Sequence, residues 1–146
     1  MKFTKMLLML GAVISLSSGC ASTKQLVALP DQTKTIEDST KARIYVLRPI
    51  FLPPLISMTV SDGEEKIGST GPNGYLCWER APGETEIRSK SENTAVLPLT
   101  CKAGEVYYIG QHARVGALFA RTSLSLLTEE QGKEKLTKCK PPHINR

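Results

Sequence analysis

The chain has 146 residues, a formal net charge of +5, 40% hydrophobic and 23% charged residues, and two histidines. This length fits one domain with a modest core. Because the basic and acidic residues are interspersed along the chain, the sequence lacks the clustered Lys and Arg of a nucleic-acid-binding domain.

The first nineteen residues are typical of a secretory signal peptide. Lys2 and Lys5 give a positive start, and an apolar run follows from Met6 to Leu16. A run of this length is too short for a transmembrane helix, which needs about 20 apolar residues. A charged start, a short apolar stretch and small residues beyond it predict export and cleavage.

The small residues end on Cys20, and this segment resembles a lipobox, in which the cysteine receives acyl chains and becomes the new N-terminus. Ser17 departs from that pattern, because Leu is commoner at its place. The alternative is cleavage after Ser22 by the general signal peptidase, which would discard Cys20. Two or more acyl chains anchor a protein stably without a transmembrane helix. By the same resemblance, Ala21 favours the outer membrane of a Gram-negative cell.

Residues 20–41 are polar apart from one short apolar patch, and we expect a lipidated N-terminus followed by a flexible tether. A flexible chain of this length would span roughly 25 Å. We expect the folded domain to occupy residues 42–146.

From Ala42 onward, short β-type runs alternate with turn signals such as Asp62-Gly63 and Lys102-Ala103-Gly104. This spacing favours an antiparallel sandwich or barrel. Thr128 and Gln131 then match a helix capping box, although Gly132 weakens a helix at this position. The expected strands and hairpins are 42–49, 56–69, 74–80, 84–90, 94–101, 105–112 and 120–127, with a short helix within 128–139.

Five segments between residues 42 and 139 occur in an order that resembles a family of bacterial envelope lipoproteins, built on a domain of unknown function and similar to the PEGA-type β-sandwich. They are ARIYVLRP, SDGEEKIGS, GYLCWERAPGETEI, AGEVYYI and TEEQGKEKL. The resemblance implies a mainly β protein: a small antiparallel β-sandwich with a short C-terminal helix. It supplies no catalytic residues.

Three cysteines remain beyond Cys20, and an oxidising periplasm permits a disulfide. Loop entropy separates the pairings by less than about 1 kcal/mol, so the spacing leaves them open. Cys77–Cys139 would join the last helix to the sheet, and the family resemblance includes cysteines at both places. Cys101 is the alternative partner of Cys77, and three free thiols are a further alternative. The cysteines lack the close spacing of structural zinc sites, and we expect no metal and no cofactor.

The candidate binding residues are His112, Arg114 and Arg121, which alternate with apolar residues in 111–121. The segment could serve a partner, a glycan or the membrane surface. The simpler interpretation is a crossover loop that packs its apolar members into the core.

The expected function is therefore a noncatalytic lipoprotein of the outer membrane, facing the periplasm and anchored through acyl chains on Cys20. It would be an interaction or structural module that binds envelope protein or cell-wall glycan. Two alternatives are a small hydrolase that uses His112 with a serine, and a carrier of an apolar ligand.

Overall fold

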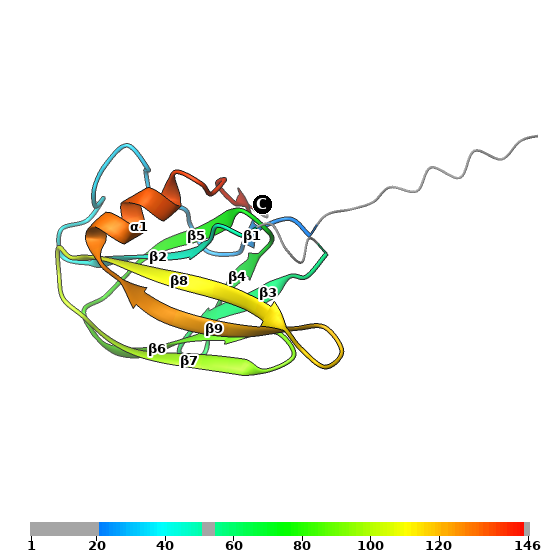
Figure 1. The fold of residues 1–146 in the computed structure, drawn as a ribbon. Helices are drawn as coiled ribbons and strands as arrows, with labels where there is room; N and C mark the ends of the chain where they lie inside the picture. Colours follow the sequence, from blue (N-terminus) through cyan, green and yellow to red (C-terminus); the bar gives the residue numbers. More distant parts are fainter. Residues whose placement is uncertain (1–20, 51–54, 145–146) are drawn as a thin grey trace, which may run out of the picture.

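A computed structural model describes residues 21–50 and 55–144, and these form a two-layer β structure with one short C-terminal helix (Figure 1). The segment predicted to be a signal peptide, residues 1–19, lies outside the described residues, as do Cys20 and residues 51–54. The elements are β1 Lys24–Gln25, β2 Ala42–Arg48, β3 Met58–Asp62, β4 Glu65–Thr70, β5 Gly74–Arg80, β6 Gly83–Lys90, β7 Thr94–Cys101, β8 Val106–Val115, β9 Ala120–Leu127, α1 Glu129–Leu136 and β10 His143–Ile144.

One sheet has six strands in the order β10-β1-β4-β3-β6-β7, and the other has four in the order β5-β2-β8-β9. Most neighbours are antiparallel, as the sequence predicts. Two pairs are parallel instead, β2 with β8 and β1 with β10. The pair β2–β8 can be parallel because five intervening strands carry the chain back to the end of the sandwich at which β2 begins.

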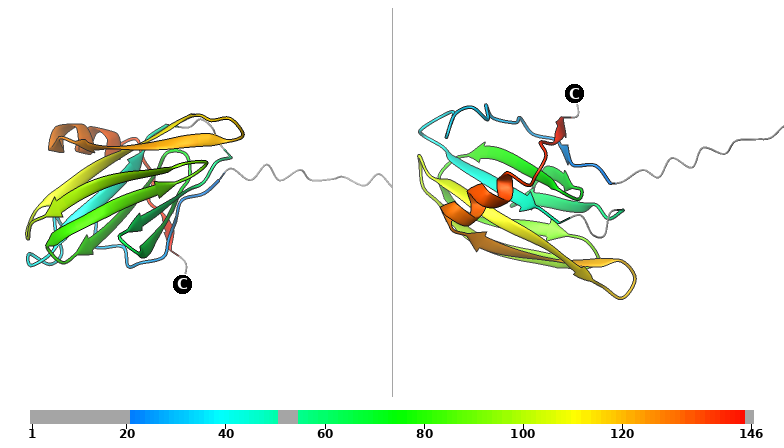
Figure 2. Two further views of the ribbon diagram at one scale, coloured as in Figure 1. Left: turned by 90° about the horizontal axis from the view of Figure 1, so that it is seen from below. Right: turned by 45° about the horizontal axis from the view of Figure 1, so that its top comes forward.

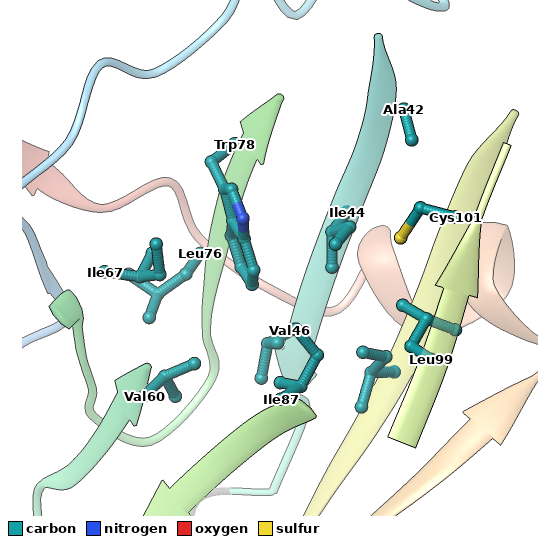
Figure 3. Close-up of a cluster of buried hydrophobic side chains, with 11 residues drawn as sticks. Ala42, Ile44, Val46, Val60, Ile67, Leu76, Trp78, Ile87, Leu99 and Cys101 are labelled. Atoms are coloured by element: carbon teal, nitrogen blue, oxygen red, sulfur yellow. The ribbon is translucent and has the colours of Figure 1, made fainter. Parts of the chain in front are cut away.

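The main core lies between the two sheets, where alternate residues of facing strands interdigitate (Figure 3). Strand β2 contributes Ala42, Ile44 and Val46 to it, as expected for alternating inward positions. Trp78 is also part of this core, and its indole N–H donates to the Asp62 carboxylate at 2.9 Å. The other members are Val60, Ile67, Leu76, Ile87, Leu99, Cys101 and Ile109.

A second apolar cluster covers the opposite face of the four-stranded sheet, so every residue of β2 is buried. Tyr45 stacks on Tyr108 with ring centroids 5.2 Å apart, and α1 packs over them through Leu136. The capping box of Thr128 and Gln131 begins this helix, as predicted from the sequence. The other members of the cluster include Leu47, Tyr75, Cys77, Leu29, Val106, Leu127 and Cys139.

Gly132, which weakened the prediction of a helix, is required by this packing. It is buried against Tyr108, and a Cβ at this position would overlap the tyrosine ring. The close approach of α1 to the sheet therefore depends on the missing side chain.

Residues 21–41 pack on the sandwich, so the expectation of a flexible tether is not met (Figure 2). Thr23 and Gln25 are buried, and β1 pairs with β4 and β10. Further along the segment, the buried Arg43 guanidinium donates to the carbonyls of Asp31 and Lys34. The Gln25 and Gln32 side chains and the backbone N–H groups of Glu37 and Asp38 also hydrogen-bond to residues of the sandwich.

Candidate functional site

Four turns and the beginning of the described chain meet at one end of the sandwich, which we call the hairpin end. It consists of residues 21–23, 55–57, 71–73, 91–93 and 116–119. Pairing of Met58 with Thr70 and of Thr59 with Lys90 brings the first three turns together. Figures 1 and 2 show the β8–β9 hairpin reaching the same end.

The N-terminal residues are fixed at the hairpin end by close backbone contacts. The Thr23 hydroxyl accepts a hydrogen bond from the Gly71 N–H at 2.9 Å. A Cβ on Gly71 would overlap the Ala21 carbonyl oxygen, and one on Gly74 would overlap the Thr23 side chain. The chain is therefore part of the folded unit from its third residue after Cys20.

Residues 111–121 form a hairpin, so the expected crossover loop is wrong. Strand β8 continues to Val115, and β9 begins at Ala120 in direct register with it. The apolar residues of the tip were expected in the core, but the side chains project outward. Val115 is 95% exposed, Leu118 82% and Phe119 68%.

Glu92, which the sequence did not single out, is hydrogen-bonded to the backbone of this tip. Its carboxylate accepts hydrogen bonds from the backbone N–H groups of Ala117, Leu118 and Phe119 at 3.1, 3.2 and 3.0 Å. These bonds, led by that from Phe119, lower the pKa of the Glu92 carboxyl. A Cβ on Gly116 would overlap the carboxylate, so a larger residue at this position would require the Glu92 side chain to move.

An apolar groove of about 600 Å³ runs between the tip and the chain that precedes β3. Leu55 is 66% exposed and lies across this groove from Leu118 and Phe119. The groove floor and rim are completed by Ile56, Ser57, Thr59, Lys90, Ser91 and Glu92.

A buried polar chain joins the two sheets on the inner face of the same hairpin. The Gln111 side-chain amide contacts Thr70 and donates to the Ser89 hydroxyl at 2.7 Å. Ser89 in turn shares a 2.7 Å hydrogen bond with Thr122. Because each of these groups has a partner, this series of hydrogen bonds fixes the hairpin relative to both sheets.

The three binding residues suggested by the sequence lie together on the outer face of the β8–β9 hairpin. Arg114 stands opposite Arg121, and His112 stands opposite Ser123 two positions farther from the tip. Both arginines are exposed. A signal for this arrangement was present in the sequence, since the two arginines are equally spaced from residues 116–119.

His112 also meets the geometric condition of the hydrolase alternative, because its Nε2 lies 3.1 Å from the Ser125 Oγ. Burial, followed by the charges of Lys135 and Arg114, lowers the pKa of His112, so the imidazole is neutral at pH 7. No carboxylate is among the groups that shift this pKa, and neither residue lines the apolar groove. Among the residues that the structure describes, no hydrogen bond joins His112 to an acidic group of the kind that orients a catalytic histidine.

The three described cysteines are free thiols, and the expected disulfide is not present in the structure. Cys77 and Cys139 belong to the same outer cluster, whereas Cys101 lies in the core between the sheets. Burial raises the pKa of both Cys77 and Cys139 to about 11, so neither is a reactive thiolate at neutral pH.

In residues 21–50 and 55–144, no helix has the length and apolar character needed to cross a bilayer. The same residues contain no group of three or more His, Cys, Asp or Glu side chains that could hold a metal ion.

Residues 38–122 match the model of the family described as Protein of unknown function (DUF2846). The chain belongs to this family. The DUF2846 match runs from just before β2 into β9, so it includes the hairpin tip, Glu92, Arg114 and Arg121. It leaves out α1, Cys139 and the N-terminal segment through residue 37.

The chain is also similar to a protein of Haemophilus influenzae described as uncharacterized, with 24% identity over 96 residues. The alignment covers 65% of this chain and 57% of that relative. This chain therefore spans little more than half of that relative's length.

Proposed function

We propose that this protein is a noncatalytic lipoprotein of the outer membrane that faces the periplasm and acts as an interaction module. Acyl chains on Cys20 are the anchor. The leader of residues 1–19 and the lipobox-like residues before Cys20 support export and acylation. The observation that carries the structural part is that Thr23 is already buried in the sandwich.

The burial of Thr23 shortens the distance from the membrane at which the module can bind a partner. A flexible tether of about 20 residues would let the domain move roughly 25 Å from its anchor. Here only Ala21 and Ser22 separate Cys20 from the buried Thr23. The acylated protein is then held against the bilayer in a narrow range of orientations, which favours an envelope protein beside the membrane over a remote partner.

The proposal of a noncatalytic role rests on the surroundings of His112. The histidine has a serine within hydrogen-bonding distance, but Lys135 and Arg114 are the charged groups that act on it. Two cations oppose the imidazolium that forms when histidine removes a proton from a nucleophile. The environment thus works against general-base catalysis.

Anchoring is tested by replacing Cys20 with Ala, with Cys139→Ala as the matched control. We expect the first variant to lose acyl mass and to leave the membrane fraction in high salt. The control is expected to retain both properties. A Cys20→Ala protein that remains membrane-bound after washing contradicts the anchoring proposal.

The partner is tested by introducing a photo-crosslinking residue at Val96 or Leu126, which are 48% and 54% exposed on the terminal strands of the two sheets. Crosslinking in intact cells is expected to give one reproducible protein adduct. The same residue at Lys34, in the N-terminal segment, is the control. Adducts to glycan alone would show that the partner is glycan and not protein. The absence of any reproducible adduct would contradict the proposal of an interaction module.

A further inference from the structure

We propose that the tip of the β8–β9 hairpin rests on the same lipid bilayer that holds the acyl chains of Cys20. The contact surface consists of Val115, Leu118 and Phe119, together with Leu55 across the groove. This inference depends on the proposed anchoring, and it adds a second membrane contact made by the folded domain.

Position is the first argument. Ala21 follows Cys20 directly in the chain and packs on Gly71 at the hairpin end. From Gly71 the turns are linked through β4, β3 and β6 to Glu92, which binds the hairpin tip. An anchor on Cys20 therefore brings the hairpin end, and not the opposite end of the sandwich, toward the bilayer.

The second argument is the apolar character of this end. The four side chains are between 66% and 95% exposed, and three of them lie in one tight turn or on the strand residue directly before it. Clustered exposed apolar groups on a soluble domain mark a partner or membrane surface. Phenylalanine and leucine are side chains that peripheral proteins bury at the level of the lipid headgroups.

The third argument concerns the backbone of the tip. A turn that enters a region poor in water must have its N–H groups satisfied from within the protein. The Glu92 carboxylate supplies acceptors for the N–H groups of residues 117–119, and the Phe119 carbonyl accepts from the Gly116 N–H at 3.2 Å. The tip thus presents apolar side chains outward while its amides are bonded inward.

Charge is the fourth argument. Arg114 and Arg121 are one position behind the tip, and the exposed Lys90 lines the groove beside it. Cations at this height can reach anionic headgroups while the apolar tip lies deeper. The acidic group at this site, Glu92, has its charge satisfied by three amides and lies near Arg121.

The test uses the full acylated chain, reconstituted into vesicles of phosphatidylethanolamine and phosphatidylglycerol, with tryptophan as a depth probe. The native Trp78 is 3% exposed in the core and serves as a constant background. The probe is introduced by Phe119→Trp. Ala103→Trp is the matched control, since Ala103 is an exposed turn residue at the opposite end of the sandwich.

We expect the emission of the Phe119→Trp protein to shift to the blue on vesicles and to lose intensity when the lipids carry bromine on their acyl chains. The Ala103→Trp protein is expected to show neither change. Vesicle-bound protein whose introduced tryptophan at position 119 is not quenched by the lipids overturns this inference and leaves the anchoring intact. Shielding of that tryptophan from aqueous acrylamide without lipid quenching would show that protein covers the tip, which also overturns it.

Flotation separates the two proposals. Protein that fails to float with the vesicles, and that lacks acyl mass, overturns the anchoring and the bilayer contact together. Protein that floats and shows quenching at position 119 supports both.

Discussion

Replacing Gln25 with Ala tests whether the N-terminal segment is a structural part of the sandwich. The Gln25 side chain accepts from the Cys77 N–H at 3.0 Å and donates to the Cys77 carbonyl at 2.7 Å. Its amide therefore satisfies the backbone N–H and carbonyl of Cys77 at the outer edge of β5, as a neighbouring strand would. Both hydrogen bonds are buried, and Gln25 itself has no exposed surface.

The expected loss in the free energy of unfolding follows from the two backbone groups of Cys77 that lose these hydrogen bonds. A buried polar group left without a partner costs about 1–3 kcal/mol, so the pair implies about 2–6 kcal/mol. Typical domains unfold with only about 5–15 kcal/mol, so the variant is expected to lose a large part of its stability. Urea denaturation measures this loss, with the exposed neighbour Lys24→Ala as control.

Limited trypsin digestion supplies a second readout, since β1 must detach before the protease can cut at Lys24. We expect rapid cleavage there in the Gln25→Ala protein and slow cleavage in the wild type. A loss below about 0.5 kcal/mol, which is the range of ordinary surface substitutions, with unchanged digestion, would refute the role of Gln25 at the edge of β5.

Three further predictions concern packing and charge. The Glu79 carboxylate pairs with the buried Arg43 guanidinium at 2.8 Å. Burial raises the pKa of the Glu79 carboxyl, but hydrogen bonds from the Glu37 and Asp38 N–H groups and from Arg43 outweigh this effect and hold the pKa below 4.5. The stability that this pair contributes is thus complete above about pH 4.5 and is lost as the pH falls through the folded-state pKa of Glu79. Glu79→Gln should therefore lower the free energy of unfolding by about 3 kcal/mol at pH 7, and acid-denaturation curves should show this difference from the wild type shrinking as the pH falls. Gly132→Ala should destabilise the protein by about 1–3 kcal/mol in thermal unfolding, despite the better helix former, because the new methyl overlaps Tyr108. Glu92→Gln should speed amide hydrogen exchange at the hairpin tip without changing exchange in the core, and equal exchange in both proteins would show that the carboxylate does not order the tip.

The strands of the sandwich could be predicted because local chemistry specifies them. Pro49 follows the end of β2, and Gly63 adopts a positive φ of 59° at the turn expected from Asp62-Gly63. The capping box at Thr128 is likewise a local pattern. Signals of this kind depend on neighbours in the chain, so the sequence is sufficient to locate them.

The N-terminal segment could not be predicted in this way, because its hydrogen-bonding partners lie far along the chain. Gln25 bonds to Cys77, which is 52 positions away. A buried glutamine and a solvated one look the same in a sequence, and only the open edge of β5 decides between them. The polarity of residues 20–41 predicts a tether, but it carries no information on the distant backbone groups of β5 that Gln25 satisfies.

The exposure of the hairpin tip could not be predicted from a local pattern either. Val115, Leu118 and Phe119 have the composition of a buried loop, but the register of β8 with β9 turns them outward. Apolar residues that face solvent in the free domain are indistinguishable by composition from core residues. Their placement needed the partner strand and Glu92, neither of which a local pattern reveals.

The N-terminal segment links attachment to folding. It joins the six-stranded sheet through pairing of β1 with β4, and it joins the four-stranded sheet through Gln25 and Cys77. If Cys20 is acylated as proposed, tension on the anchor acts on these same bonds. Loss of the Gln25 bonds would then have two effects, since it would destabilise the sandwich and also lengthen the free chain between domain and membrane. A Gln25→Ala protein that remains folded should therefore show weaker lipid quenching at a tryptophan introduced by Phe119→Trp, because the hairpin end would no longer be held against the bilayer.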